Sequence, residues 1–142
     1  MNNTTQRMTL EQGRAAFAYE CAVAGEKLDK KKEYKSYVRK LPMLIKTNGL
    51  GAAIAFALAK GSKEGKPDDL RNAWGLLYVQ IEKWLREDQK GLLDLQKIGL
   101  MEALAQAESS VYRAVTVEVL ALLSWIKRFA EALIDGEPQD SI

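Results

Sequence analysis

Apolar residues recur at intervals of three and four along most of the chain, the spacing that places side chains on one face of an α-helix. The first such stretch predicts a helix that Thr9 could cap and that ends near Gly25. The residues that share one face of this helix are Leu10, Arg14, Phe17, Ala18, Cys21, Ala24 and Leu28. A basic turn over residues 28–32 separates it from the next helical stretch.

The second stretch predicts a helix that runs to Asn48-Gly49, where two residues that tolerate positive φ favour a helix end. Pro42 removes a backbone donor, but the apolar stripe stays in phase across it, so we expect a kink there rather than a break. That stripe comprises Tyr34, Tyr37, Val38, Leu41, Leu44 and Ile45. Four cations fall together on roughly the opposite side: Lys32, Lys35, Arg39 and Lys46. The pattern therefore predicts one face in the core and one cationic face.

The middle of the chain continues the helical pattern. Residues 50–60 predict a short and almost wholly apolar helix, and residues 61–67 predict a surface loop rich in glycine and lysine. Asp68 or Asp69 could cap the following helix. Its apolar stripe is the most regular in the chain and comprises Leu70, Trp74, Leu77, Tyr78, Ile81, Trp84 and Leu85.

The last third of the chain predicts two more helices. The first is a weaker helix over residues 94–107, interrupted at Gly99, and the second runs from Ser109 or Ser110 to about Ile134. Because the second is apolar on nearly all sides, we expect it to be central. The fold class is therefore all-α, a single compact bundle of five or six helices over residues 9–135, with a long central C-terminal helix and flexible ends at residues 1–8 and 136–142.

Composition narrows the class of protein. The chain has 142 residues, of which 47% are apolar, enough for one packed domain. Its polar start lacks the apolar core of a secretion signal, and its longest apolar run, Leu50 to Ala59, is too short to span a bilayer. The single cysteine fits a reducing compartment. We therefore expect a cytoplasmic protein that makes no membrane contact.

The sequence offers no convincing catalytic or cofactor-binding motif. The absence of histidine removes the commonest general base and transition-metal ligand. Gly49-Leu50-Gly51 resembles part of a dinucleotide-binding turn, but helical spacing and Pro42 precede it where such a turn needs a strand. Cys21 lies on an apolar stripe, so we expect it to be buried and inert. The acidic residues do not converge and the aromatic residues lie mostly on core stripes, so we expect a non-enzyme without metal or cofactor.

Charge is distributed unevenly along the chain. Up to Lys66 there are 13 Lys and Arg against 6 Asp and Glu, a net charge of +7, whereas from Pro67 onward the counts are 8 and 13, a net charge of −5. A basic half suggests an anionic partner such as nucleic acid, although Lys-rich surfaces are also common on soluble helical proteins. Cations on one rigid face can follow phosphates without reading bases, and the candidates for this role are Lys32, Lys35, Arg39 and Lys46.

Three blocks of sequence carry packing and surface patterns, in order and over most of the chain. They are Arg14 to Ala18; Tyr34 to Pro42 with Ile45 and Asn48 to Phe56; and Tyr112, Arg113, Thr116, Glu118 and Trp125 to Ala130. Together these blocks resemble the small subunit of type III-B CRISPR effectors, the Cmr complexes. The resemblance implies a non-catalytic subunit, several copies of which line up beside the backbone subunits along the path of the target RNA.

The same resemblance implies which molecules the chain contacts. The partners would be other Cmr subunits, especially the backbone subunit, further copies of the chain, the target RNA and the CRISPR RNA. A second candidate group for RNA contact is Arg113, Lys127 and Arg128. The alternative is a helical protein–protein adaptor whose basic face meets an acidic protein and never contacts RNA. If the two oppositely charged halves face opposite ends of the domain, copies could also associate head to tail.

Overall fold

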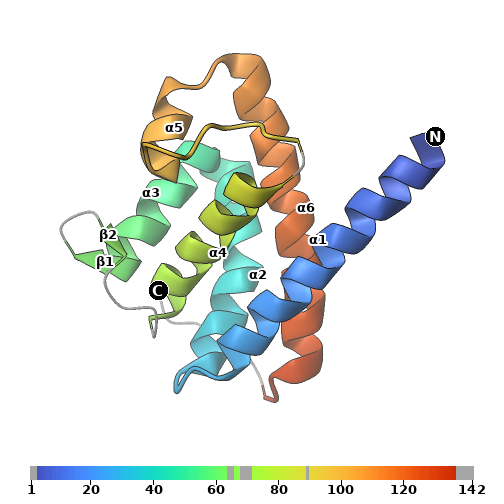
Figure 1. Ribbon diagram of the computed structural model, residues 1–142. Coiled ribbons are helices and arrows are strands. Elements are labelled where there is room, and N and C mark those ends of the chain that lie inside the picture. The colour runs from blue at the N-terminus through green and yellow to red at the C-terminus, as the bar shows by residue number, and fades with distance from the viewer. Residues whose placement is uncertain (1–2, 64–65, 68–71, 89, 137–142) are drawn as a thin grey trace.

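The computed structural model describes residues 3–63, 66–67, 72–88 and 90–136 (Figure 1). The helices in this part of the chain are α1 (Asn3–Glu26), α2 (Lys31–Asn48), α3 (Leu50–Gly61), α4 (Ala73–Glu87), α5 (Leu100–Gln106) and α6 (Ser109–Leu133). Between α3 and α4, Ser62–Lys63 (β1) and Lys66–Pro67 (β2) pair as a minimal antiparallel ladder. The prediction of an all-α bundle of five or six helices is confirmed.

Helix α6 lies along one side of the bundle, where it packs against α1 and α2, whereas α2 contacts α1, α3, α4 and α6. Figure 1 shows α1 crossing α6 along one side and α2 lying beside it, and both helices contact α6. Its fully buried face follows helical spacing and comprises Val115, Val119, Leu122, Leu123 and Ile126. By length and composition alone α6 could cross a membrane, a test that the core helix of a soluble protein also passes. The predicted long C-terminal helix is confirmed, but its outer side is open, with Val117 67% exposed, and α2 is the helix at the centre of the packing.

Helices α3 and α4 pack against one another, and both contact α2. Gly61, at the end of α3, approaches α4 so closely that a Cβ there would lie 2.1 Å from the backbone nitrogen of Gly75. In the same layer, the ring of Phe56 meets that of Trp74 edge to face, with centroids 5.3 Å apart. The close packing holds the end of α3 beside the start of α4.

The observed bounds of α1 and α2 can be compared with those predicted for the first two helices. Helix α2 runs unbroken through Pro42 and stops at Asn48, followed by Gly49 with φ of +91°, as predicted. Helix α1 begins at Asn3 and not after Thr9, because a helix that packing has already nucleated extends readily through polar residues. The predicted flexibility of residues 1–2 and 137–142 concerns positions outside the described residues.

Helix α4 is capped by a different residue from those predicted. The cap of α4 is Asn72, whose Oδ1 accepts hydrogen bonds from the Trp74 and Gly75 backbone N–H groups at 2.9 and 3.4 Å. The predicted caps, Asp68 and Asp69, and the first stripe residue, Leu70, lie outside the described residues.

The weak helix expected over residues 94–107 is helical only from Leu100, with Gly99 at its cap position. The Asp94 side chain accepts from the Gln96 N–H at 3.1 Å, and Asp88 likewise accepts from the Lys90 and Gly91 N–H groups. Such local bonds compete with helix formation. They explain why residues 90–99 form an irregular segment.

Candidate nucleic-acid interface

Lys35 does not belong to an exposed cationic face. Its side chain is 9% exposed, and its ammonium donates hydrogen bonds to the carbonyl oxygens of Ile134 at 2.8 Å and Gly136 at 2.7 Å. Ile134 is the residue that closes α6, so the charge lies at the negative end of that helix dipole. The prediction of Lys35 as a phosphate contact assumed that it faces solvent, and the structure corrects this: the segment that follows α6 covers it.

The same segment divides the predicted cationic stripe. Lys32 is exposed but lies against Gly136, its Cε 2.9 Å from the place where a Cβ on Gly136 would be. Arg39 and Lys46 are also exposed, and neither has a hydrogen bond or ion pair within the described parts of the chain. These two, the α2 cations, are seven residues apart on one side of the helix, about 10 Å along its axis. The α2 cations are what remains of the stripe as an open surface.

The second candidate group lies on the outer side of α6. Arg113, Lys127 and Arg128, the α6 cations, are all exposed. Arg128 packs over the Trp125 ring, with its guanidinium carbon 5.1 Å from the ring centroid. The indole N–H of Trp125 donates to Glu11 of α1 at 2.6 Å, so Arg128 belongs to the α1 side of α6. Arg113 and Lys127 form no ion pair with any described element and remain open to solvent.

The helices that carry the two groups are neighbours. Helices α2 and α6 lie side by side (Figure 1), and Lys46 precedes the corner at which α2 turns into α3. At that corner the Gly51 N–H donates to the hydroxyl of Tyr112 at 2.7 Å, and Tyr112 directly precedes Arg113. The fold therefore places Lys46 and Arg113 at the same end of the bundle.

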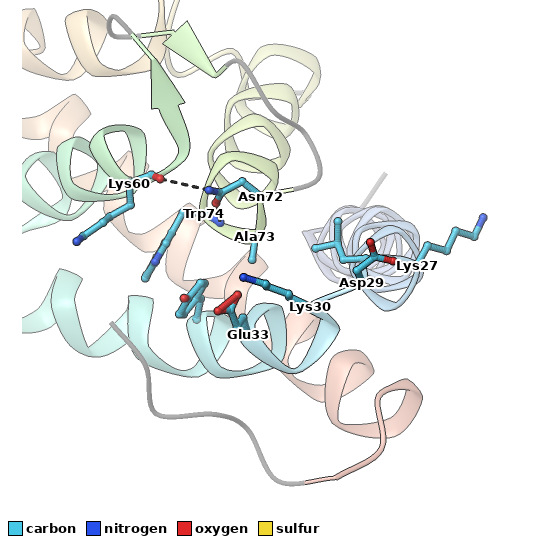
Figure 2. A pocket seen from close by; sticks show the side chains of 10 residues that line it. Lys27, Asp29, Lys30, Glu33, Lys60, Asn72, Ala73 and Trp74 are labelled. Atoms are coloured by element: carbon cyan, nitrogen blue, oxygen red, sulfur yellow. Dashed lines mark hydrogen bonds between the residues drawn. The ribbon is translucent and has the colours of Figure 1, made fainter.

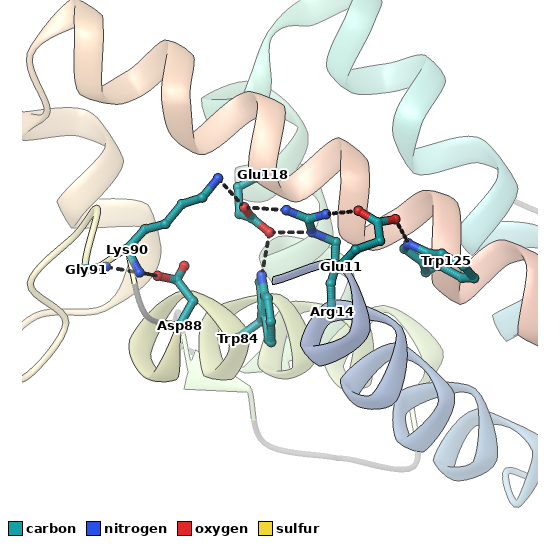
Figure 3. Close-up of polar contacts among 8 residues, drawn as sticks. All are labelled: Glu11, Arg14, Trp84, Asp88, Lys90, Gly91, Glu118 and Trp125. Atoms are coloured by element: carbon teal, nitrogen blue, oxygen red, sulfur yellow. Dashed lines mark hydrogen bonds and ion pairs between the residues drawn. The ribbon is translucent and has the colours of Figure 1, made fainter. Parts of the chain in front are cut away.

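A buried carboxylate ties three helices together at another place (Figure 3). Glu118 of α6 is 1% exposed, and its two oxygens accept hydrogen bonds from Arg14 of α1 at 2.8 and 3.1 Å. The indole N–H of Trp84 in α4 donates to it at 2.9 Å, and the Lys90 ammonium forms an ion pair with it at 2.9 Å. We call these four residues the Glu118 cluster. The side chains of Arg14, Trp84 and Lys90 therefore share Glu118 as an acceptor.

The surroundings of Glu118 also decide its ionisation. Burial alone would raise the pKa of Glu118, but the hydrogen bonds from Arg14, Lys90 and Trp84 outweigh this and lower the pKa from 4.5 to about 2. The sequence pattern did not reveal this cluster. The available signal was position, since Glu118 lies three residues after Val115 and four before Leu122, on the apolar face of a long helix.

The two oppositely charged halves of the chain are not separate ends of the molecule. Helix α1, from the basic half, packs along α6 from the acidic half, and α3 packs on α4 in the same way. Figure 1 shows these segments interleaved. The assumption behind head-to-tail association through the charge split is therefore wrong.

The residues set aside as non-catalytic occupy core positions. Cys21 is 4% exposed, and burial raises the pKa of its thiol to about 12, which confirms the prediction of a buried thiol. Gly49 and Gly51 follow a helix, as the spacing predicted. Within the described residues, no group of three His, Cys, Asp or Glu side chains is placed to hold a metal ion.

Known proteins resemble this chain over most of its length. The family described as "CRISPR-associated protein (Cas_Cmr5)" matches residues 10–133. The "CRISPR system Cmr subunit Cmr5" of Thermus thermophilus is 35% identical over 127 residues, which are 89% of this chain and 97% of the relative. The crystal structure of a CRISPR-associated Cmr5 family protein from the same organism matches with a TM-score of 0.64 at 33% identity, covering 89% of this chain and 97% of the other.

Proposed function

The chain belongs to the Cmr5 family of CRISPR-associated proteins, and from that premise we propose that it is a non-catalytic, RNA-binding subunit of a cytoplasmic Cmr complex. The Thermus relative is named as a subunit of the Cmr system, which supports other Cmr subunits as the partners of this chain. Its role is geometric and electrostatic. Cleavage of RNA belongs to other components of the complex.

The observation that carries RNA contact is the state of the outer cations. Arg39, Lys46, Arg113 and Lys127 are exposed and have no ion pair with any described residue, although the same chain provides acceptors for its inner cations, Arg14 and Lys35. Exposed cations on two neighbouring rigid helices can neutralise phosphates without reading sequence. The target RNA, beside the CRISPR RNA, is the polyanion that such a complex offers.

We further propose that several copies of the subunit line up along the target RNA, beside the backbone subunits. Family membership supports this arrangement, and the charge split of the sequence does not, because the two halves interleave. Repetition would add affinity, since two α2 cations on one copy form a small site and linked copies bind with higher avidity.

A protein interface on the same face of α2 is the second candidate. Met43, which lies between the α2 cations at helical spacing, is 68% exposed. An exposed methionine flanked by cations suits an apolar contact with an acidic rim on another protein. In that case the α2 cations would join this chain to a Cmr subunit and would not contact RNA.

The experiment is a reconstitution with a Cmr complex that lacks its small subunit. Wild type, a variant with Arg39→Glu and Lys46→Glu, and a control with Lys83→Glu and Lys97→Glu are compared for incorporation and for target-RNA binding. The control removes two exposed cations outside the proposed contacts. Lys35 is left unchanged, because removing its buried ammonium would disturb the fold.

Each outcome shows whether the α2 cations contact RNA or another protein. We expect the α2 variant to incorporate like wild type and to weaken target-RNA binding by about tenfold or more at low salt, while the control keeps wild-type binding. Failure of the α2 variant to incorporate would assign the face to a protein partner and contradict RNA contact. Failure of wild type to incorporate would contradict the proposed membership in the complex.

A further inference from the structure

A pocket of about 560 Å³ opens where the start of α2, the end of α3 and the start of α4 meet (Figure 2). The polar and aromatic residues that line it include Lys30, Glu33, Tyr37, Lys60, Asn72 and Trp74. A volume of this order accommodates a nucleotide-sized ligand. We call it the α2–α3–α4 pocket; it lies apart from the α2 and α6 cations, none of which lines it.

Two buried aromatic residues in its wall carry polar groups without partners. The rings of Tyr37 and Trp74 stack with centroids 4.2 Å apart and an angle of 11° between planes, and the residues are 7% and 3% exposed. Neither the Tyr37 hydroxyl nor the Trp74 indole N–H has a hydrogen-bond partner among the described residues, and neither atom is sealed from solvent. The other two indole N–H groups, of Trp84 and Trp125, both donate to carboxylates. Because both atoms reach solvent and neither has a partner in the described chain, these two groups are available to a ligand.

Two helix N-termini also meet at the pocket. Helix α4 begins at Asn72 and Ala73 in its wall, and helix α2 begins at Lys30, where no side chain caps the first turn. The Trp74 and Gly75 N–H groups of α4 are already bonded to Asn72, so α4 contributes only its dipole. The first turn of α2 has no side-chain cap, and its free N–H groups and dipole favour an anion. Here the buried, unpartnered Tyr37 and Trp74 side chains mark the same spot.

Two ammonium groups add to this positive potential. Lys30 and Lys60 line the pocket, and neither has an ion pair within the described chain, although Lys60 rests over the Phe56 ring at 5.7 Å. Figure 2 shows the Lys30 ammonium beside Ala73 and Glu33, on the opposite side of Trp74 from Lys60, whereas Lys27 and Asp29 are directed away. Glu33, on the same side as Lys30 in Figure 2, supplies a hydrogen-bond acceptor.

We propose that the α2–α3–α4 pocket binds a ribonucleotide. Lys30, the Trp74 indole N–H and the N-terminus of α2 hold its phosphate, Lys60 adds positive potential from the other side of Trp74, and Glu33 accepts from a ribose hydroxyl. An acidic protein side chain would satisfy the donors but brings no hydroxyl for Glu33 to accept from, whereas the ribose of a nucleotide does, so a nucleotide fits the lining better. The proposal rests on the proposed function only for the source of the nucleotide, which would be a unit of the target RNA. The pocket chemistry stands without it.

The test is a titration of the full chain with adenosine 5′-monophosphate, followed by the ¹H–¹⁵N signals of the three tryptophan indoles. The Trp74 signal, assigned with Trp74→Phe, should shift and saturate, while those of Trp84 and Trp125 stay. Lys30→Gln should weaken binding about tenfold, because it removes a charge-assisted hydrogen bond, and Lys60→Gln should weaken it by about twofold, because it removes only positive potential. The matched control Lys97→Gln should bind like wild type, and dispersed spectra show that each variant is folded. A short single-stranded RNA should compete with the mononucleotide if the pocket accepts a unit of a strand.

Several results would overturn the proposal. They are a Trp74 signal that does not saturate, binding that survives both lysine substitutions, inorganic phosphate that binds as tightly as the nucleotide, and a glutamate-rich peptide that fills the pocket in its place. The two proposals fail separately. The Arg39→Glu and Lys46→Glu variant should keep nucleotide binding, and Lys60→Gln should still enter the Cmr complex.

Discussion

The Glu118 cluster and the α2–α3–α4 pocket are built from the same kinds of side chain, yet they differ in whether those side chains bond to one another. Each has a tryptophan, a lysine and a glutamate contributed by different elements. In the cluster, the Trp84 N–H, the Lys90 ammonium and Arg14 all bind Glu118. In the pocket, the Trp74 N–H and the ammonium groups of Lys30 and Lys60 form no hydrogen bond or ion pair with a described residue. Polar groups that satisfy one another hold a fold together, whereas polar groups that line a pocket and have no partner in the chain are available to a ligand.

The largest effect on stability is expected when the carboxylate of the Glu118 cluster is removed. Glu118→Ala would leave the Nε and Nη2 groups of Arg14 and the Trp84 N–H without their acceptor, so that Arg14 keeps only Glu11, an exposed partner. Breaking a buried charge pair in this way costs about 3–5 kcal/mol, so we expect a fall of that size in the free energy of unfolding, measured by urea denaturation. Glu131→Ala, on the exposed side of the same helix, should change it by less than about 0.5 kcal/mol. Equal effects of the two substitutions would show that the cluster is not a structural centre.

Protonation of Glu118 at low pH should remove the stability that the Glu118 cluster contributes. The pKa of Glu118 is lowered in the folded protein from 4.5 to about 2, so its contribution is complete above pH 4.5 and is lost as the pH falls toward 2. A shift of this size corresponds to about 3 kcal/mol. The free energy of unfolding of wild type should therefore fall between these pH values by about that much more than that of Glu118→Gln. Parallel pH profiles would contradict the assignment.

Lys35 is a buried cation and should contribute to stability, unlike the exposed cations of the same helix. Lys35→Met should lower the free energy of unfolding by about 2 kcal/mol, because two carbonyls at the end of α6 lose a charged donor. Lys46→Met, on the same helix but exposed, should change it by less than about 0.5 kcal/mol. If thermal and urea denaturation gave the two variants the same stability, the distinction between inner and outer cations would be lost.

The smallest effect concerns the thiol. Burial raises the pKa of Cys21 to about 12, so the reactive thiolate is scarce at neutral pH. Folded protein should react with iodoacetamide far more slowly than protein unfolded in urea, as followed by mass spectrometry. Comparable rates in the two states would show that α1 does not bury this position.

The sequence was sufficient to predict the helices whose pattern is regular. The stripes of α2, α4 and α6 correspond to buried faces in the structure, and the glycine after Asn48 ends α2 as expected. The weaker pattern over residues 94–107 was wrong for residues 94–99, because Asp94 binds the backbone N–H of Gln96 and competes with helical bonds there. Local side-chain competition of this kind leaves little trace in hydrophobic periodicity.

The candidate site was predictable only in part. Periodicity correctly put Arg39 and Lys46 on one exposed side of α2, but it could not show that residues 134–136, about a hundred positions away, would cover Lys35. Arg14 and Glu118 belong to separate blocks that resemble the Cmr family, and their pairing across the fold is a tertiary contact. The α2–α3–α4 pocket arises where three helix ends meet, which no single stretch of sequence reveals.

The salt dependence of target-RNA binding by the reconstituted complex tests directly whether the α2 cations contact RNA. If Arg39 and Lys46 each neutralise a phosphate, changing both to Gln should reduce the slope of log K against log salt by roughly 1.5 for every copy in contact with RNA. The Lys83→Gln and Lys97→Gln control should keep the wild-type slope. An α2 variant that incorporates normally and binds RNA with unchanged slope and affinity would contradict the account.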